Sequence, residues 1–210
     1  VYSQPDNIDW LVPPQGFGLP YLNSTGNSTI INDVTNIGVI NPASISNFDC
    51  LSFGISYQIN PEIENGWLND SPVKRNNQFL PQSVGAIYKF DNLAFGLGFN
   101  QRYNIETEFN WNSSGYGSPD ITEFVGNVYS YSAITAYSFN ELFTQSSKLV
   151  LGFNTTYNQV KFSQNDQGSL TELTDNAINF IFGIQYIVKN DEDRETSLGI
   201  SYITNTKFES

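Results

Sequence analysis

The sequence contains no histidine and a single cysteine, Cys50, among its 210 residues. Without histidine, a Ser-His-Asp triad, a Cys-His pair and any histidine-ligated metal site are impossible. One cysteine also excludes a disulfide bond within the chain. We therefore expect a protein that is not an enzyme and that needs neither a metal ion nor a cofactor.

Charged residues are scarce, and the basic ones are the scarcest. They make up 14% of the chain, against roughly 25% in an ordinary soluble domain. Nine Lys and Arg face 21 Asp and Glu, which gives a formal net charge of −12. Phosphate binding needs clustered basic residues, so we expect no nucleic-acid partner.

Long hydrophobic runs are also missing. No stretch reaches the roughly 18 apolar residues that a membrane helix needs. The start of the chain carries no basic region followed by an apolar core, so we expect that any signal peptide has already been removed. These absences exclude helical membrane spans but leave membrane strands possible, because alternating strands have near-neutral mean hydropathy.

The composition is rich in aromatic and small polar residues instead of charged ones. Phe, Tyr and Trp make up 15% of the chain, and the polarity comes from Asn, Ser, Thr, Gln and Gly. This mixture favours strands and turns over helices. Seven stretches alternate between apolar and polar residues, at about 48–59, 80–90, 93–105, 126–139, 147–162, 175–189 and 195–208.

The first of these stretches shows the pattern clearly. Large apolar side chains from Leu51 to Ile59 alternate with Ser52, Gly54, Ser56 and Gln58. Each stretch is long enough for the roughly 9–11 residues of a tilted membrane strand. The polar faces carry almost no charge, which favours a confined lumen over bulk water. A secreted soluble β-sandwich or barrel, with the apolar face inward, remains the alternative.

The links between the stretches alternate in length. Those at 60–79, 106–125 and 163–174 are long and polar, whereas those at 91–92, 140–146 and 190–194 are short. Outer-membrane barrels have this arrangement, with long loops at one end and tight turns at the other. Aromatic residues near the expected strand ends would form girdles at the membrane interfaces; they are Tyr57, Tyr88, Phe90, Tyr103, Tyr137, Phe139, Tyr157 and Tyr186.

Residues 1–47 have no lasting period and are rich in Pro, Gly and Asn. We interpret 1–47 as an N-terminal extension that folds into the lumen as a hatch, and 48–210 as the barrel strands. Prolines lack the donor that a strand needs, and glycines allow tight bends. Apolar residues of the hatch would line the path of a ligand. The expected hatch and ligand-path residues are Phe17, Leu19, Ile37, Asn41 and Pro42.

Lys89 and Arg102 are predicted on lumen-facing positions of neighbouring strands. A cation inside a barrel can contact a carboxylate head group or favour the passage of anions. A salt bridge to a carboxylate of the hatch is the other interpretation of these two residues.

Four segments resemble the FadL-type outer-membrane transporter family. They are Gln15-Gly16-Phe17-Gly18-Leu19-Pro20, Asn41-Pro42-Ala43, "SVGAIYKFDNLAFGLGFNQRYN" (83–104) and "TSLGISYITNTKF" (196–208). The resemblance implies an all-β, antiparallel transmembrane barrel of about fourteen strands with an N-terminal hatch that contains the Asn-Pro-Ala sequence. Only seven strands are visible here, and Ile45-Ser46 follows where the family usually has a glycine.

The resemblance also implies a function, a location and partners. We expect a bacterial outer-membrane protein, surrounded by lipid, that transports hydrophobic small molecules such as long-chain fatty acids. The alternative is a structural or secretion-associated barrel that transports nothing and binds a protein partner through its external loops. Seven strands would leave two unpaired edges, so we expect a partial barrel that further residues or another chain completes.

Overall fold

The computed structural model describes residues 34–38, 40–60, 63–68, 71–75, 78–111, 120–142, 145–166, 169–191 and 194–205. Two short 3₁₀ helices come first, η1 (Val34–Asn36) and η2 (Pro42–Asn47). All other elements are strands: β1 (Leu51–Asn60), β2 (Ile63–Leu68), β3 (Ser71–Arg75), β4 (Gln78–Phe90), β5 (Leu93–Trp111), β6 (Asp120–Asn140), β7 (Ser147–Asp166), β8 (Ser169–Asp191) and β9 (Arg194–Ile203).

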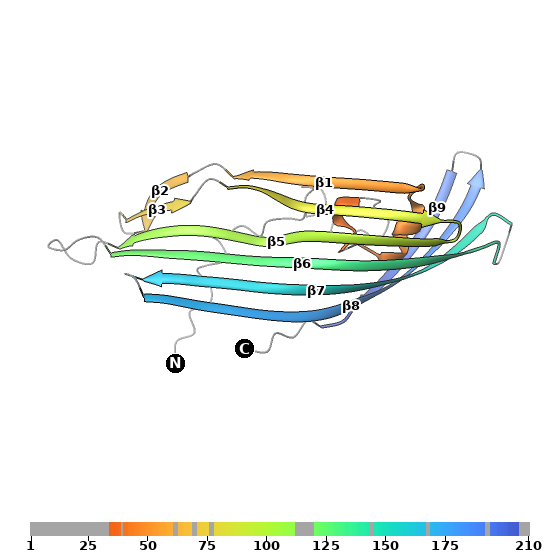
Figure 1. Cartoon of the computed structure of the whole chain (residues 1–210). Coiled ribbons are helices and arrows are strands. Elements are labelled where there is room, and N and C mark those ends of the chain that lie inside the picture. Colours follow the sequence, from red (N-terminus) through yellow and green to blue (C-terminus); the bar gives the residue numbers. More distant parts are fainter. Residues whose placement is uncertain are drawn as a thin grey trace.

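The strands form one antiparallel sheet in the order β1-β4-β5-β6-β7-β8-β9. The short hairpin β2–β3 lies off this path, where β3 pairs with β5 (Figure 1). The seven strands of the main path are the seven alternating stretches of the sequence, and consecutive ones pair as predicted. The antiparallel all-β fold is therefore confirmed.

The sheet is open in the part of the chain that the structure describes. There, β1 pairs only with β4 and β9 pairs only with β8. Both edge strands have ten residues, whereas the central strands β5 to β8 have 19 to 23. The open sheet agrees with the expectation that these seven strands do not close on themselves.

The strands are longer at one end than predicted. The three short links lie together at the other end, as expected for consecutive antiparallel strands. The link at 163–174, however, is mostly strand, because Asp166 pairs with Ser169 and the two strands continue to that point. Part of the link at 106–125 is strand as well, since β5 runs to Trp111 and β6 begins at Asp120. Asn, Ser, Thr and Gln suggest loops in a sequence, yet they pair readily once a neighbouring strand satisfies their backbone groups.

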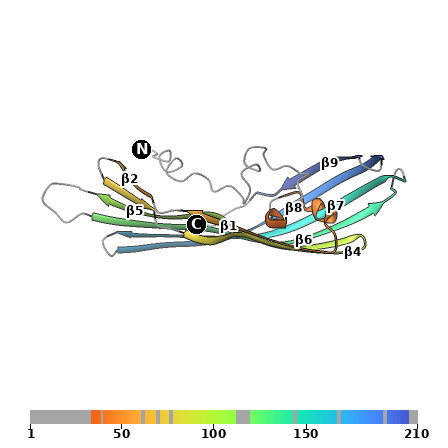
Figure 2. The same ribbon diagram turned by 90° about the horizontal axis from the view of Figure 1, so that it is seen from above.

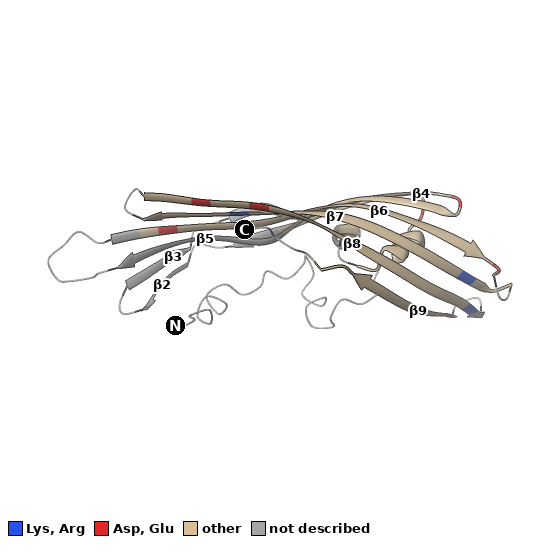
Figure 3. Ribbon diagram, turned by 90° about the horizontal axis from the view of Figure 1, so that it is seen from below, with Lys and Arg blue, Asp and Glu red and all other residues tan. Residues whose placement is uncertain are grey.

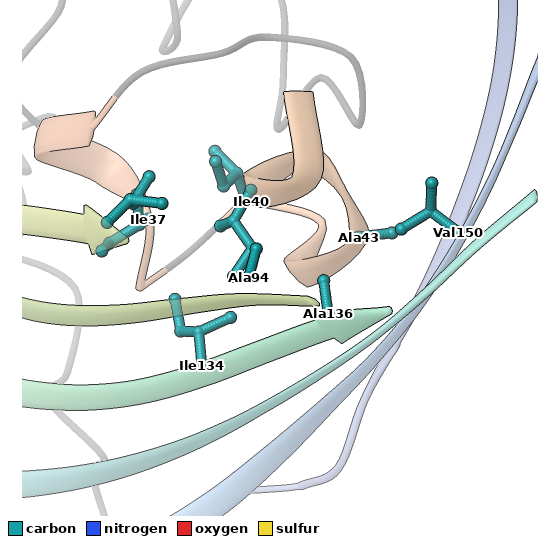
Figure 4. Packing of buried hydrophobic residues seen from close by; sticks show 9 residues of the cluster. Ile37, Ile40, Ala43, Ala94, Ile134, Ala136 and Val150 are labelled. Atoms are coloured by element: carbon teal, nitrogen blue, oxygen red, sulfur yellow. The ribbon is translucent and has the colours of Figure 1, made fainter. Parts of the chain in front are cut away.

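The sheet curls around the segment that precedes β1. We call residues 34–48 the N-terminal segment. Figure 2 shows η1 and η2 on the concave side of the sheet, with β9 and the β4 side on either side of them. Buried apolar side chains join the segment to the sheet, as Figure 4 shows for most of them; they are Ile37, Ile40, Ala43 and Ile45 from the segment and Ile87, Ala94, Ile134, Ala136 and Val150 from the sheet. Burying each isoleucine stabilises this arrangement by roughly 1.5–3 kcal/mol.

Among the described residues, no helix is long and apolar enough to cross a membrane.

Candidate functional site between the sheet and the N-terminal segment

The convex face of the sheet carries exposed large apolar side chains on all seven strands of the main path. Leu51 is 71% exposed, Leu97 67% and Phe182 50%. On the central strands Phe95, Leu97, Leu151, Phe180 and Phe182 are exposed, and Leu149 is half-buried. A soluble sandwich would bury such side chains under a second layer, whereas among the described residues they lie on an open face of the sheet.

Register aligns these side chains across the sheet. Phe153 of β7 lies opposite Thr135 of β6 and Phe182 of β8, and Leu151 lies opposite Tyr137 and Ile184. On β7 the outward-facing run extends from half-buried Leu149 to exposed Tyr157, and on β8 it extends from exposed Ile178 to half-buried Val188. We call this aligned surface the apolar band. Its height is nine residues on β7 and eleven on β8, which is the length of a tilted membrane-crossing strand.

Charged residues lie at the borders of the apolar band. On the face of the apolar band, Lys161 follows it on β7 and Glu172 precedes it on β8, whereas Lys148 and Asp175 lie on the concave-facing side of the same strands. In Figure 3 the stretch of sheet beside η1 and η2 is tan, and blue and red segments lie toward its two ends.

Aromatic rings also mark the borders. Tyr131 and Tyr157 neighbour each other at one border, with ring centroids 6.3 Å apart. Tyr137 and Phe139 lie at the other, with centroids 4.8 Å apart. The sequence suggested that such rings sit at strand ends. Tyr157 instead lies in the middle of β7, because the strand continues beyond the band.

The concave face is lined by small residues where η2 rests on it. Ala94, Ala136, Gly152 and Gly183 lie opposite one another in the register of β5, β6, β7 and β8. A Cβ atom on Gly152 would collide with the backbone nitrogen of Ala43, and one on Gly183 would collide with Oδ1 of Asn41. These two glycines therefore allow the backbone of the N-terminal segment to approach the sheet directly.

Asn41 connects the N-terminal segment to two strands. It is 2% exposed, and its side-chain amide donates to the carbonyl oxygens of Ile184 on β8 (3.1 Å) and Ile200 on β9 (3.3 Å). Its Oδ1 accepts from the backbone nitrogen of Ala43 at 3.0 Å, which caps η2. Pro42 occupies the first helical position, where its missing N–H costs nothing.

Further polar contacts fix the segment along its length. Asn154 Nδ2 donates to the Gly38 carbonyl at 3.2 Å, and Lys148 Nζ donates to the Ser46 carbonyl at 3.4 Å. Asn47 Nδ2 donates to Oε1 of Gln185 at 3.1 Å. The segment is thus held by donors from β7 and by acceptors on β8 at several points, which limits its movement as a unit.

Buried polar side chains continue beyond the segment. Ser83, Asn100, Ser130 and Asn158 lie opposite one another in the register of β4, β5, β6 and β7. We call these four residues the polar row. Ser130 Oγ donates to Asn158 Oδ1 at 2.6 Å, and Asn158 Nδ2 donates to Asn179 Oδ1 at 2.7 Å. Ser83 Oγ and both side-chain polar atoms of Asn100 are buried without a hydrogen-bond partner.

The two predicted lumen cations, Lys89 and Arg102, lie far apart along neighbouring strands. Lys89 lies on the concave-facing side of β4 with Ser83 and Ile87, as predicted. Its partner on β5 is Ala94, eight positions from Arg102, which is roughly 26 Å along the strand. Arg102 sits where the β5–β6 register shifts between Gln101 and Tyr103. Its side chain lies outside the described residues.

The structure places the predicted ligand-path residues differently. Phe17 and Leu19 lie outside the described residues. Ile37 is fully buried against the sheet, with its side chain over Gly96 and Gly98. Asn41 and Pro42 are buried in the contact with β8. The described members of the set therefore attach the segment to the sheet.

Sequence reasoning missed Asn100, Ser83, Gly152 and Gly183 as members of the site. Their only signal was a position on the polar side of an alternating strand, which they share with many other residues.

Within the described ranges, no group of three or more His, Cys, Asp or Glu residues is placed to hold a metal ion. No protein-family model matches the sequence, and no curated protein matches it at a significant level, so its function has to be inferred from this geometry.

Proposed function

We propose that the chain forms part of an outer-membrane β-barrel of the FadL type that takes up hydrophobic small molecules such as long-chain fatty acids. The apolar band is the observation that carries the proposal. It offers an uncharged surface of the right height to lipid on seven neighbouring strands. A soluble protein rarely exposes a continuous apolar patch of such extent.

The concave face supports the transport part of the proposal. Its described side chains are polar or aliphatic and few are charged, and the N-terminal segment covers part of it as a hatch would. A hydrophobic molecule that passes such a hatch meets both apolar side chains and hydrogen-bonding groups, which together suit an amphiphile. Further strands, from the same polypeptide or from another chain, would complete the barrel at β1 and β9.

Uptake in cells tests the proposal. The polypeptide is expressed in bacteria that lack their own uptake of long-chain fatty acids, and entry of a radiolabelled fatty acid is compared with entry of a small hydrophilic solute. We expect fatty-acid uptake to rise at unchanged entry of the hydrophilic solute. A matched variant without residues 15–40 should lose this selectivity while it still reaches the membrane.

Equal entry of both solutes, or uptake no higher than in cells without the protein, would contradict transport. A protein that reaches the outer membrane without changing uptake would favour the structural or secretion-associated alternative.

A further inference from the structure

Two side chains of the polar row have hydrogen-bond partners, and the other two have none among the described residues. Ser130 and Asn158 bond to each other, and Asn158 also bonds to Asn179. Ser83 and Asn100 are equally buried, at 1% and 2% exposure, and lie directly opposite each other on β4 and β5. They nevertheless make no hydrogen bond to each other or to another described residue through Ser83 Oγ, Asn100 Nδ2 or Asn100 Oδ1.

Such groups are rare in native proteins and costly. Each buried polar atom without a partner costs about 1–3 kcal/mol, and most native examples have a specific explanation. The three atoms here could be satisfied together by one small group. Asn100 Nδ2 donates, Asn100 Oδ1 accepts, and the Ser83 hydroxyl does both.

The surroundings define the chemistry of that group. Lys89 lies on the same side of β4 but six residues from Ser83, roughly 20 Å along the strand. None of the side chains in the polar row is charged, and burying an unpaired charge is costly; the side chain of Arg102, two residues beyond Asn100 on β5, lies outside the described residues. A neutral group that both donates and accepts hydrogen bonds fits best.

Apolar side chains adjoin the pair on one side. Ile37 lies over Gly98, two residues before Asn100 on β5, and Ile87 lies beside Gly96. The backbone of Gly38 passes close to the Asn100 amide, because a Cβ on Gly38 would stand 2.8 Å from Asn100 Nδ2. The pair is thus enclosed between the N-terminal segment and the sheet, with apolar and polar surface next to each other.

We propose that Ser83 and Asn100 form a binding subsite for the neutral polar head group of an amphiphile, such as a hydroxyl, a protonated carboxyl or a carboxamide. The inference rests on the proposed function and narrows its substrate class to molecules with an uncharged, hydrogen-bonding head. A bridging water would satisfy the same atoms and is the competing explanation.

Photoaffinity labelling tests the subsite. The protein is reconstituted in lipid nanodiscs and labelled with a sixteen-carbon alcohol that carries a diazirine beside the hydroxyl. We expect labelled peptides from β4 and β5 around Ser83 and Asn100. Unlabelled hexadecanol should compete about tenfold better than hexadecane, because two neutral hydrogen bonds contribute about 1.4 kcal/mol together.

Three variants separate recognition from packing. Asn100→Leu keeps similar volume and removes both polar atoms, and we expect labelling of β4 and β5 to fall about tenfold. Ser83→Ala removes one hydroxyl without adding volume and should give a smaller loss in the same direction, which keeps the test valid if the leucine variant fails to fold. Ser130→Ala is the matched control, because Ser130 lies opposite Asn100 on β6 but has a partner within the protein.

The subsite is overturned if hexadecane competes as well as hexadecanol, if β4 and β5 remain unlabelled, or if Ser130→Ala lowers labelling as much as Asn100→Leu. Fatty-acid uptake by the wild-type protein is measured in parallel. If the wild-type protein takes up fatty acid but Asn100→Leu is labelled as strongly as the wild type, the subsite alone is contradicted. If the wild-type protein takes up no fatty acid, the proposed function is contradicted.

Discussion

Single residues decide how closely the N-terminal segment approaches the sheet. Gly152 and Gly183 face each other on β7 and β8. Backbone atoms of Pro42 and Ala43 occupy the space beside Gly152, and the side chains of Asn41 and Pro42 occupy the space beside Gly183. The amide of Asn41 then reaches the carbonyls of two strands. Contact between η2 and the sheet thus depends on the absence of side chains at Gly152 and Gly183 as much as on the hydrogen bonds of Asn41.

We therefore expect Gly152→Ala to destabilise the protein, by about 1–3 kcal/mol if the sheet and segment shift to admit the methyl group. Its Cβ would meet backbone atoms of Pro42 and Ala43, which cannot rotate away. Gly96→Ala is the control, since its Cβ would lie 3.3 Å from Cδ1 of Ile37, the end of a flexible side chain. The thermal unfolding midpoint, followed by circular dichroism, should fall clearly more in the first variant. Equal midpoints would contradict the seating of η2 on the sheet.

At the scale of elements, the main departure from the sequence prediction is the length of the central strands. Beyond the apolar band, β7 and β8 continue to the pair Asp166 and Ser169 through mostly polar residues, among which Phe162, Leu170 and Leu173 are exposed. Residues in these extensions carry no alternation between apolar and polar faces. Their strand character comes from pairing with neighbours, which a local pattern does not report.

Hydrogen exchange distinguishes a paired extension from a loop. We expect the amides of residues 163–166, which pair with both β6 and β8, to exchange much more slowly than those of residues 142, 145 and 146 in the link before β7, because ladder hydrogen bonds protect them. Both regions lie outside the apolar band, so water reaches both. Exchange at 163–166 as fast as at 142, 145 and 146, measured by mass spectrometry, would show that the sequence interpretation of 163–166 as a loop was correct.

The parts predicted from sequence are those with a local signal. Alternation at 147–157 gives β7 and its outward face, and the short link at 91–92 gives the pairing of β4 with β5. The partners of Asn41 lie 143 and 159 residues away along the chain, so no local pattern indicates them. The register shift beside Arg102 is likewise a property of the paired strands, and no local pattern indicates it.

At the scale of the whole molecule, the proposed function requires the apolar band to face lipid. Spin labels test this assignment in a Cys50→Ser background, with the protein reconstituted in liposomes. A label at Phe153, inside the band, should collide more with oxygen than with a water-soluble nickel chelate, because oxygen concentrates in hydrocarbon. A label at Lys161, beyond the band on the same strand, should show the reverse. Equal collision ratios at the two positions would contradict the membrane placement.

The two edges of the sheet carry backbone groups that need hydrogen-bond partners if the molecule lies in a membrane. An edge strand carries a row of unpaired N–H and C=O groups, and each such group costs several kcal/mol in hydrocarbon. Leu51 to Tyr57 of β1 and Leu198 to Tyr202 of β9 belong to the apolar band, so both edges would lie at membrane depth. An open sheet of this kind is not stable in lipid, and pairing at both edges removes the cost.

We therefore expect both edges to be paired with further strands in the native membrane. A photoreactive amino acid placed at Ser52 on β1 or at Ser201 on β9 should crosslink to polypeptide, either a strand outside the seven or a strand of another chain. The same residue placed at Ser132 on β6, which has neighbours on both sides and lies against Gly38, should crosslink only within the sheet and to the N-terminal segment, and it serves as the control. Crosslinks to lipid alone from both edge positions would show that the edges are bare, and they would remove the basis for a completed barrel.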